Sequence, residues 1–279
     1  MSPNSSVPQC QNSQCPENRS FWLRRLRRPK GIWFNKKWYC SLECLEEGTA
    51  SVFSRFNLKN ERNPPARYRL PLGLLMLSKG LISSEHLQQT LKAQRESQRG
   101  RFGEWLRTLG IVTEDQLTAM LGMQWGYPVF HLAQSPGFSE CANMVPLHIL
   151  EFSRMAPVHV LPISRTLYIA FSDGIDFSAL RGLEQMLDYG TQPCVIGDAE
   201  MTEALEAIGR MDRPSEIVID CPSSAHELAH VTRDWAASNH AEHIRAVNCP
   251  GCLWVRIDNA SVIGHLIFKF QEVAPAMAL

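Results

Sequence analysis

The sequence contains no apolar run of about 18 residues, which is the length that a membrane-spanning helix requires. Its opening residues, MSPNSSVPQCQNSQCPEN, have neither the positive charge nor the apolar stretch of a secretory signal peptide. We therefore expect a cytoplasmic protein that does not insert into a membrane.

An excess of charge is also missing. Lys and Arg number 28, and Asp and Glu number 28, so the formal net charge is zero. No overall field therefore attracts nucleic acid or an acidic membrane, and any such attraction has to be local. A chain of 279 residues is long enough for two or three modest domains.

The motifs of the large enzyme classes are absent too. No G-x-x-x-x-G-K-[ST] loop is present, so we expect no ATPase motor activity. No Ser or Cys lies in a recognisable nucleophile turn. HELAH, from His226 to His230, matches the H-E-x-x-H pattern of zinc peptidases, but no third ligand is identifiable and the sequence favours a surface helix. We expect a protein that is not an enzyme.

The composition changes along the chain and predicts an α+β multidomain protein. Residues 1–55 are rich in Cys, Trp and Arg, and residues 56–69 form a charged linker with two prolines. Residues 70–210 combine a helical part (70–132) with an α+β half (142–210) in which short strands alternate with helices. Residues 213–275 predict a second, smaller α+β unit.

Four of the nine cysteines form two close pairs near the N-terminus, and in a reducing compartment such pairs indicate a metal site before a disulfide. Tetrahedral zinc takes four thiolates, which two short turns can supply. A segment of about 50 residues has little core of its own, so a structural metal would stabilise it. We predict one zinc ion in a treble-clef-like knuckle, held by Cys10, Cys15, Cys40 and Cys44.

Other polar clusters have weaker interpretations. The segment from Arg19 to Lys37 holds eight Lys or Arg and no acid, which fits nucleic-acid binding, a docking surface or a solvated loop. A second His2Cys2 site is conceivable, although the CPGC sequence also fits a tight turn; its residues are His240, His243, Cys249 and Cys252. We expect the isolated cysteines to be small buried apolar residues: Cys141, Cys194 and Cys221.

Two stretches of the helical part repeat each other at an offset of 30 residues. They are PLGLLMLSKGLISSEHLQQTLKAQ (71–94) and RFGEWLRTLGIVTEDQLTAMLGMQ (101–124). Each copy predicts helix, turn, helix, with a left-handed glycine ending the first helix and a Ser or Thr capping the second. The leucines are expected to face a core: Leu87, Leu91, Leu106, Leu109, Leu117 and Leu121.

A four-helix fold does not explain the glycine near the start of each copy, Gly73 or Gly103, or the glutamine that closes each copy. A glycine in a helix costs about 0.5–1 kcal/mol relative to Ala. At a helix N-terminus, which favours anions, it lets a ligand approach the backbone closely.

These residues resemble the MshEN family. The family pattern is R-L-G followed by L, G, L, L and Q. Both copies approach it, and the likeness continues through WGYPVFHL and the segment from Met144 to Met201, over roughly residues 70–205. MshEN domains are the N-terminal domains of type II secretion and type IV pilus assembly ATPases, and they bind the bacterial second messenger cyclic di-GMP. The resemblance implies a helical repeat followed by an α+β half.

It also implies a ligand site made by both copies. The second copy keeps the pattern, with Phe102 in place of Leu, whereas the first has Pro71 where the family has Arg. An inherited fold whose site has decayed is therefore the alternative. The implied ligand-binding residues are Leu72, Gly73, Gly80, Gln94, Arg101, Phe102, Gly103, Gly110 and Gln124.

The sequence thus indicates a bacterial signalling protein that binds cyclic di-GMP and relays it to a protein partner, with a secretion or pilus system as a candidate. The alternative is a scaffold that binds no nucleotide and uses the zinc knuckle as its interaction module.

Overall fold

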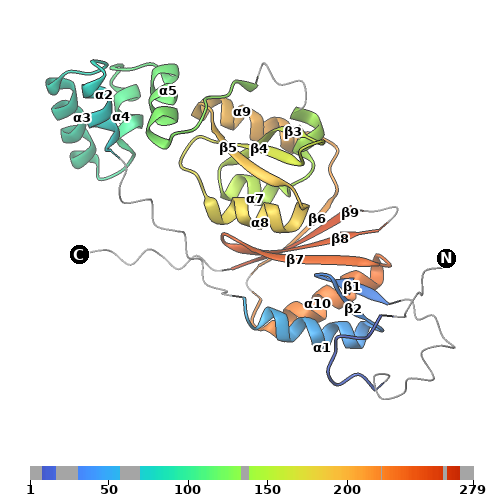
Figure 1. Ribbon diagram of the computed structural model, residues 1–279. Helices are drawn as coiled ribbons and strands as arrows, with labels where there is room; N and C mark the ends of the chain where they lie inside the picture. The colour runs from blue at the N-terminus through green and yellow to red at the C-terminus, as the bar shows by residue number, and fades with distance from the viewer. Residues whose placement is uncertain are drawn as a thin grey trace. The chain divides into compact units, whose positions relative to one another are not determined.

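The computed structural model describes residues 8–16, 31–56, 70–132, 138–220, 222–259 and 263–270 (Figure 1). They belong to two compact units. The terminal unit comprises Met1–Glu61 and Asp212–Leu279, and the central unit comprises Arg62–Met211. The mixed helices and sheets confirm the predicted α+β class. None of the helices in the described ranges is long and apolar enough to cross a membrane.

The central unit begins with the helical repeat, residues 70–132. Both predicted N-caps are present: the side-chain oxygens of Ser83 and Thr113 accept hydrogen bonds from the backbone three residues later. Gly80 and Gly110 have φ angles of +70° and +67°, as the turn requires. The four helices are α2 (Leu72–Ser78), α3 (Ser84–Ser97), α4 (Phe102–Thr108) and α5 (Glu114–Trp125).

The leucine predictions are confirmed only in part. Leu87 and Leu117 pack against the core of the repeat, whereas Leu91 and Leu121 line a groove and a cavity that are described below. Leu106 is fully buried, but Leu109 is 36% exposed because it is the C-cap of α4, where the chain turns out of the helix. The core of the repeat is small, and its buried members are Met76, Ile82, Leu106, Val112 and Met120.

The α/β half of the central unit has a three-stranded sheet in the order β3-β4-β5. β3 (Met155–Leu161) runs antiparallel to β4 (Thr166–Phe171), and β5 (Gly190–Val195) runs parallel to β4. Its helices are α6 (Phe138–Ala142), α7 (Leu147–Phe152), α8 (Phe177–Leu187) and α9 (Asp198–Gly209).

The repeat is joined to this sheet directly after α5. Val129 forms a parallel bridge to Val195, the last residue of β5. The backbone N–H of Phe130 donates to the Val195 carbonyl over 2.8 Å, and that of Val195 donates to the Pro128 carbonyl over 2.9 Å. These bonds hold the end of α5 beside the carboxyl end of β5.

The terminal unit contains a six-stranded sheet in the order β2-β1-β7-β8-β9-β6. Two strands come from the N-terminal segment, β1 (Ile32–Phe34) and β2 (Lys37–Tyr39), and four from the C-terminal segment: β6 (Ser215–Asp220), β7 (His243–Cys249), β8 (Cys252–Asp258) and β9 (Ile263–Lys269). Helices α1 (Leu42–Phe53) and α10 (Ala225–Ser238) contribute to one shared core with these strands.

The structure joins two segments that the sequence analysis placed in separate domains, 1–55 and 213–275. β1 pairs in parallel with β7, with Trp33 opposite His243. Beyond the strand, the side-chain amide of Asn35 donates to the Ala246 carbonyl over 3.0 Å and accepts from its N–H over 2.9 Å. The amide thus continues the ladder as a peptide group would. A segment this short completes its core by sharing a sheet.

Candidate functional sites

The four N-terminal cysteines are brought together as predicted. Their sulfur atoms all lie within 4.8 Å of one another. The Sγ atom of Cys40 is 3.5 Å from that of Cys15 and 3.7 Å from that of Cys44. Four thiolates about 2.3 Å from a tetrahedral zinc ion would be about 3.8 Å apart. The donor set and its spacing therefore fit a metal ion, and the thiols are not paired as disulfides.

Local structure positions the two cysteine pairs. The first pair lies on a turn in which the Asn12 side chain accepts from the N–H of Gln14 over 2.9 Å. Cys40 follows β2, and Cys44 lies in the first turn of α1, whose N-cap is Ser41. A helix N-terminus favours negative charge, so it stabilises thiolate ligands.

Burial raises the pKa values of Cys40 and Cys44 above their ordinary range, with hydrogen bonds from neighbouring thiols contributing at Cys40. Thiols in such surroundings stay protonated unless a cation compensates the charge. A bound metal ion supplies that charge, and its binding releases the protons.

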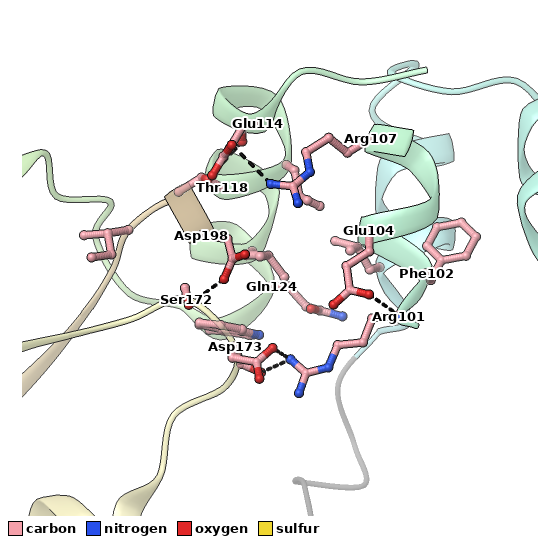
Figure 2. Close-up of a pocket in the computed structure, with 16 residues that line it drawn as sticks. Arg101, Phe102, Glu104, Arg107, Glu114, Thr118, Gln124, Ser172, Asp173 and Asp198 are labelled. Atoms are coloured by element: carbon pink, nitrogen blue, oxygen red, sulfur yellow. Dashed lines mark hydrogen bonds and ion pairs between the residues drawn. The ribbon is translucent and has the colours of Figure 1, made fainter. Parts of the chain in front are cut away.

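The central unit contains a cavity of about 470 Å³ between the helical repeat and the α/β half (Figure 2). This volume is in the usual range of small-molecule sites. The repeat contributes the first wall, from α4 and α5. The α/β half contributes the second wall, at the carboxyl ends of β4 and β5 and the start of α9; its lining residues are Ser172, Asp173, Ile196 and Asp198.

Arg101 extends from the start of α4 to Asp173 on the opposite wall of this cavity (Figure 2). It is the N-cap of α4, and its guanidinium forms an ion pair with the Asp173 carboxylate. It also donates to the Asp173 carbonyl over 2.7 Å. The Arg101 side chain is 56% exposed, so it remains accessible from solvent. It is therefore an accessible cationic group in the lining of the cavity.

A second set of polar contacts connects the repeat to α9. Arg107 pairs with Glu114 over 3.2 Å. The other oxygen of Glu114 accepts from the N–H of Ala199, in the first turn of α9, over 2.7 Å. The helix therefore receives its capping carboxylate from the repeat, because its own N-cap is Gly197 and offers no side chain.

Five of the nine implied ligand-binding residues line this cavity: Leu72, Arg101, Phe102, Gly103 and Gln124. The structure does not place the other four among its lining residues. Gly80 and Gly110 are in left-handed turns and have no neighbour within 4 Å of an added Cβ atom. Their conservation between the copies follows from the turn.

The early glycine of each copy permits close packing within the repeat. A Cβ atom on Gly73 would lie 2.7 Å from Leu87 Cδ1, and one on Gly103 would lie 2.9 Å from Leu117 Cδ1. Both glycines are buried. A neighbouring leucine therefore approaches the backbone at the place where the sequence suggested a ligand, although Gly103 also lines the cavity.

The closing glutamines exchange hydrogen bonds between the copies. Gln94, at the end of the first copy, donates to the carbonyl of Gly100, just before the second copy begins, over 3.1 Å. Gln124, at the end of the second copy, donates to the carbonyl of Leu70, just before the first begins, over 2.7 Å. Each copy thus ties its end to the start of the other.

The first copy offers a weaker counterpart of the cavity. A groove on α3 is lined by Gln88, Leu91, Lys92, Arg95 and Glu96. Three of these, Gln88, Leu91 and Arg95, are the 30-residue equivalents of Thr118, Leu121 and Trp125 in the cavity. Pro71 supplies no charge here, but Arg95 does.

The acidic wall was not foreseen from the sequence. Asp173 and Asp198 are 72 and 97 residues from Arg101, and no motif connects them. Glu114 directly follows Thr113, the cap of α5, and nothing in the sequence indicated that it also accepts a hydrogen bond from α9. Such contacts become visible only once the repeat is packed against the sheet.

The H-E-x-x-H pattern has a structural explanation. Glu227 accepts hydrogen bonds from the N–H and the hydroxyl of Ser223, both over 2.6 Å, and these bonds lower its pKa. His230 lies beside Glu46 of α1, with 3.1 Å between the two polar atoms. Within the described ranges, the four-cysteine group is the only set of side chains spaced to hold a metal ion.

The second cysteine pair forms a hairpin turn. Cys249 and Cys252 are register partners at one end of β7 and β8, and Gly251 between them is left-handed. His243 lies at the other end of β7, about 20 Å away at the usual rise per residue. Cys141 and Cys194 are buried, as predicted, while Cys221 and residues 17–30 of the basic segment lie outside the described residues.

No protein-family model and no curated protein matches the chain. Among solved structures, one of MshE with cdg is 28% identical over 50% of this chain and 99% of its own, with a TM-score of 0.44. The N-terminal domain of XpsE is similar in two crystal forms, at 18% and 19% identity, over 52% and 47% of this chain and 97% and 89% of the domain, with TM-scores of 0.37 and 0.30.

Proposed function

We propose that the protein is a non-enzymatic receptor that binds cyclic di-GMP in the cavity of the central unit and relays its level to a protein partner. The observation that carries the proposal is the placement of Arg101, Phe102, Gly103 and Gln124, all from the second repeat copy, around one cavity. The name of the similar structure, MshE with cdg, supports the same ligand.

The cavity offers the groups that a guanine nucleotide needs. A guanidinium can donate two hydrogen bonds to the O6 and N7 atoms of guanine, and Arg101 and Arg107 are available for this. Carboxylates accept from the amino group of guanine, and Glu104 and Asp173 lie beside Arg101. Phe102 and Trp125 provide aromatic surface for stacking.

The relay would use the contacts that already cross the cavity. Arg101 to Asp173, and Glu114 to Ala199, connect the repeat to the α/β half. A ligand that takes Arg101 as its own partner changes the first contact and leaves the second. The two halves can then shift against each other, and a partner bound across both would sense the change.

We also propose that the four-cysteine group holds one structural zinc ion. Zinc is the common ion for four thiolates at tetrahedral spacing. Its role here is to stabilise the terminal unit, because all four ligands lie in the short N-terminal segment.

The test of the receptor is calorimetric titration of cyclic di-GMP into the full chain, alongside two arginine variants. Arg101→Ala removes the guanidinium from the cavity lining and is expected to weaken binding at least tenfold, since a charged hydrogen bond contributes about 1.5–3 kcal/mol. Arg181→Ala removes an exposed arginine on α8, away from the cavity lining, and should bind as the unmodified chain does.

Micromolar or tighter binding that only Arg101→Ala loses would establish the receptor. Absence of heat from the intact chain at a ligand concentration of about 100 μM would contradict it. That result would favour the alternative, a scaffold in which the same domain and the metal-binding segment dock proteins.

A further inference from the structure

The terminal sheet carries a separate cleft where β1 meets β7. Its volume is about 450 Å³, and it is lined by residues that include Trp33, Lys36, His243, Arg245 and Asp258. Trp33, His243 and Asp258 form one row across β1, β7 and β8, because they are successive register partners. Side chains alternate along a strand, so this row points away from the core that contains Phe34 and Ile244.

Trp33 differs from the other large aromatic residues of the sheet. Phe34, Trp254 and Phe268 are fully buried, whereas Trp33 is 36% exposed. Its ring is nearly parallel to that of His243, with an angle of 11° between the planes and 6.5 Å between the centroids. An oriented indole with an open surface is what a nucleobase stacks on.

Positive charge surrounds this indole. Lys36 lines the cleft from the β1–β2 turn and is exposed, and Arg245 lines it from β7. No ion pair within the described ranges involves Lys36. The acid in the cleft, Asp258, is paired with Arg256 over 3.3 Å. The chain reaches β1 through the basic segment from Arg19 to Lys37, which contains no acid.

We propose that this Trp33 cleft binds single-stranded nucleic acid, with one base stacked on Trp33 and the adjacent phosphates held by Lys36 and Arg245. Charge and aromatic surface occur together here, and this combination distinguishes the occupant from an acidic peptide, which needs the cationic side chains but not the indole. The proposal is independent of cyclic di-GMP binding, because every residue of the cleft belongs to the terminal unit.

The experiment measures binding of fluorescein-labelled 15-nucleotide poly-U and poly-dT to the zinc-loaded full chain by fluorescence anisotropy over a series of salt concentrations. The variants are Trp33→Ala, Trp33→Phe and the double variant Lys36→Ala/Arg245→Ala. The matched control is Lys79→Ala/Lys92→Ala, which removes two exposed lysines from the central unit. Zinc content and thermal melting check that each variant is folded.

Trp33→Ala should weaken binding roughly tenfold with little change in salt dependence, and Trp33→Phe should retain most of the affinity. The double variant Lys36→Ala/Arg245→Ala should weaken binding and reduce the slope of log K against log salt by about 1.4, for two phosphate contacts on a single strand. The control should bind normally. If poly-U and poly-dT bind equally, the cleft reads the base and phosphate that both share, and preference for poly-U would indicate a contact to the ribose hydroxyl.

Three results would overturn the proposal. The first is failure of the intact chain to bind either oligonucleotide. The second is normal binding by both Trp33→Ala and Lys36→Ala/Arg245→Ala, which would place the interaction elsewhere on the chain. The third is loss of binding in Lys36→Ala/Arg245→Ala only, because an acidic chain of any kind would then suffice.

Discussion

Glycine serves two purposes at the residue scale of the helical repeat. Gly80 and Gly110 supply left-handed backbone at the ends of α2 and α4. Gly73 and Gly103 make room for a leucine of the partner helix. Substitution should therefore act through backbone strain in the first pair and through packing in the second.

We expect Gly110→Ala to lower the free energy of unfolding of the central unit by about 1 kcal/mol, because the left-handed region is unfavourable for a residue with a Cβ atom. Gly209→Ala is the control: Gly209 ends α9, and its added Cβ would make an ordinary 3.5 Å contact with Leu147. That substitution should be neutral or slightly stabilising. Chemical denaturation followed by circular dichroism measures both, and an equal midpoint for the two variants would contradict the argument.

A buried histidine gives the terminal unit a pH dependence. Trp254 donates its indole N–H to His265 Nδ1 over 3.2 Å, and burial, aided by Arg256, lowers the pKa of His265 to about 3. In the unfolded chain the pKa is about 6.5. Between these values the unfolded state binds a proton that the folded state does not, so stability is complete above pH 6.5 and falls as the pH decreases.

The expected loss is about 1.4 kcal/mol per pH unit below 6.5, from this group alone. His265→Gln keeps a hydrogen-bond acceptor for Trp254 but does not titrate. Thermal melting of both proteins from pH 7.5 to 5 should therefore show a steeper decline for the unmodified chain. Parallel curves would mean that His265 is protonated in the folded protein.

At the scale of elements, the hydrogen bonds made by the two closing glutamines hold the two hairpins of the repeat together. Its core is small, so the two hydrogen bonds, from Gln94 to Gly100 and from Gln124 to Leu70, are a substantial part of what joins the copies. The first bond fixes the loop that leads into Arg101. The second fixes the start of α2, where Leu72 enters the cavity wall.

Gln124→Ala should cost about 1 kcal/mol, the usual net contribution of a hydrogen bond. It should also increase amide hydrogen exchange in α2, the element at the other end of the bond. Gln89→Ala, on the exposed side of α3, is the matched control and should leave exchange unchanged. An increase in amide exchange confined to α5 would contradict a hydrogen bond that joins the two copies.

The helices of the repeat could be predicted because local residues define them, with Ser83 and Thr113 at their starts and glycine at their turns. The strands from β3 to β9 could be predicted from short apolar runs. β1 is different: it has three residues, and its partner β7 lies more than 200 residues later. Neither its length nor its pattern indicates that pairing.

The candidate sites divide in the same way. The thiols were predictable because the spacing of each pair is local. In the cavity, only the wall contributed by the repeat could be predicted, because the resemblance to MshEN domains rests on the repeated sequence. The wall that includes Asp173 and Asp198 depends on how the repeat packs against the sheet, and the bridge from Val129 to Val195 that sets this packing has no sequence signature.

At the scale of the whole molecule, the terminal unit is assembled from both ends of the chain. We expect metal removal to loosen β7, although no ligand comes from it. Treatment with a strong chelator should increase amide exchange in β1 and β7, and leave α4 and α5 of the central unit as they were.

Metal content should be one zinc per chain, lost in Cys40→Ser and retained in Cys252→Ser, a buried cysteine of the same unit outside the cluster. Elemental analysis measures this. If the rates of amide exchange in β7 do not change when the chelator is added, the sheet is stable without the metal ion.

The pairing of β1 with β7 also affects how the protein is made. β2 ends at residue 39 and β7 at residue 249, so at about 5–20 residues per second the ribosome needs roughly 10–40 s to supply the missing strand. The whole central unit emerges in that interval and can fold first. Meanwhile the nascent β1 has an open edge, which is a hazard for association with other chains. Binding of a zinc ion to the four thiols soon after their synthesis would stabilise the conformation of β1 until β7 is available to pair with it.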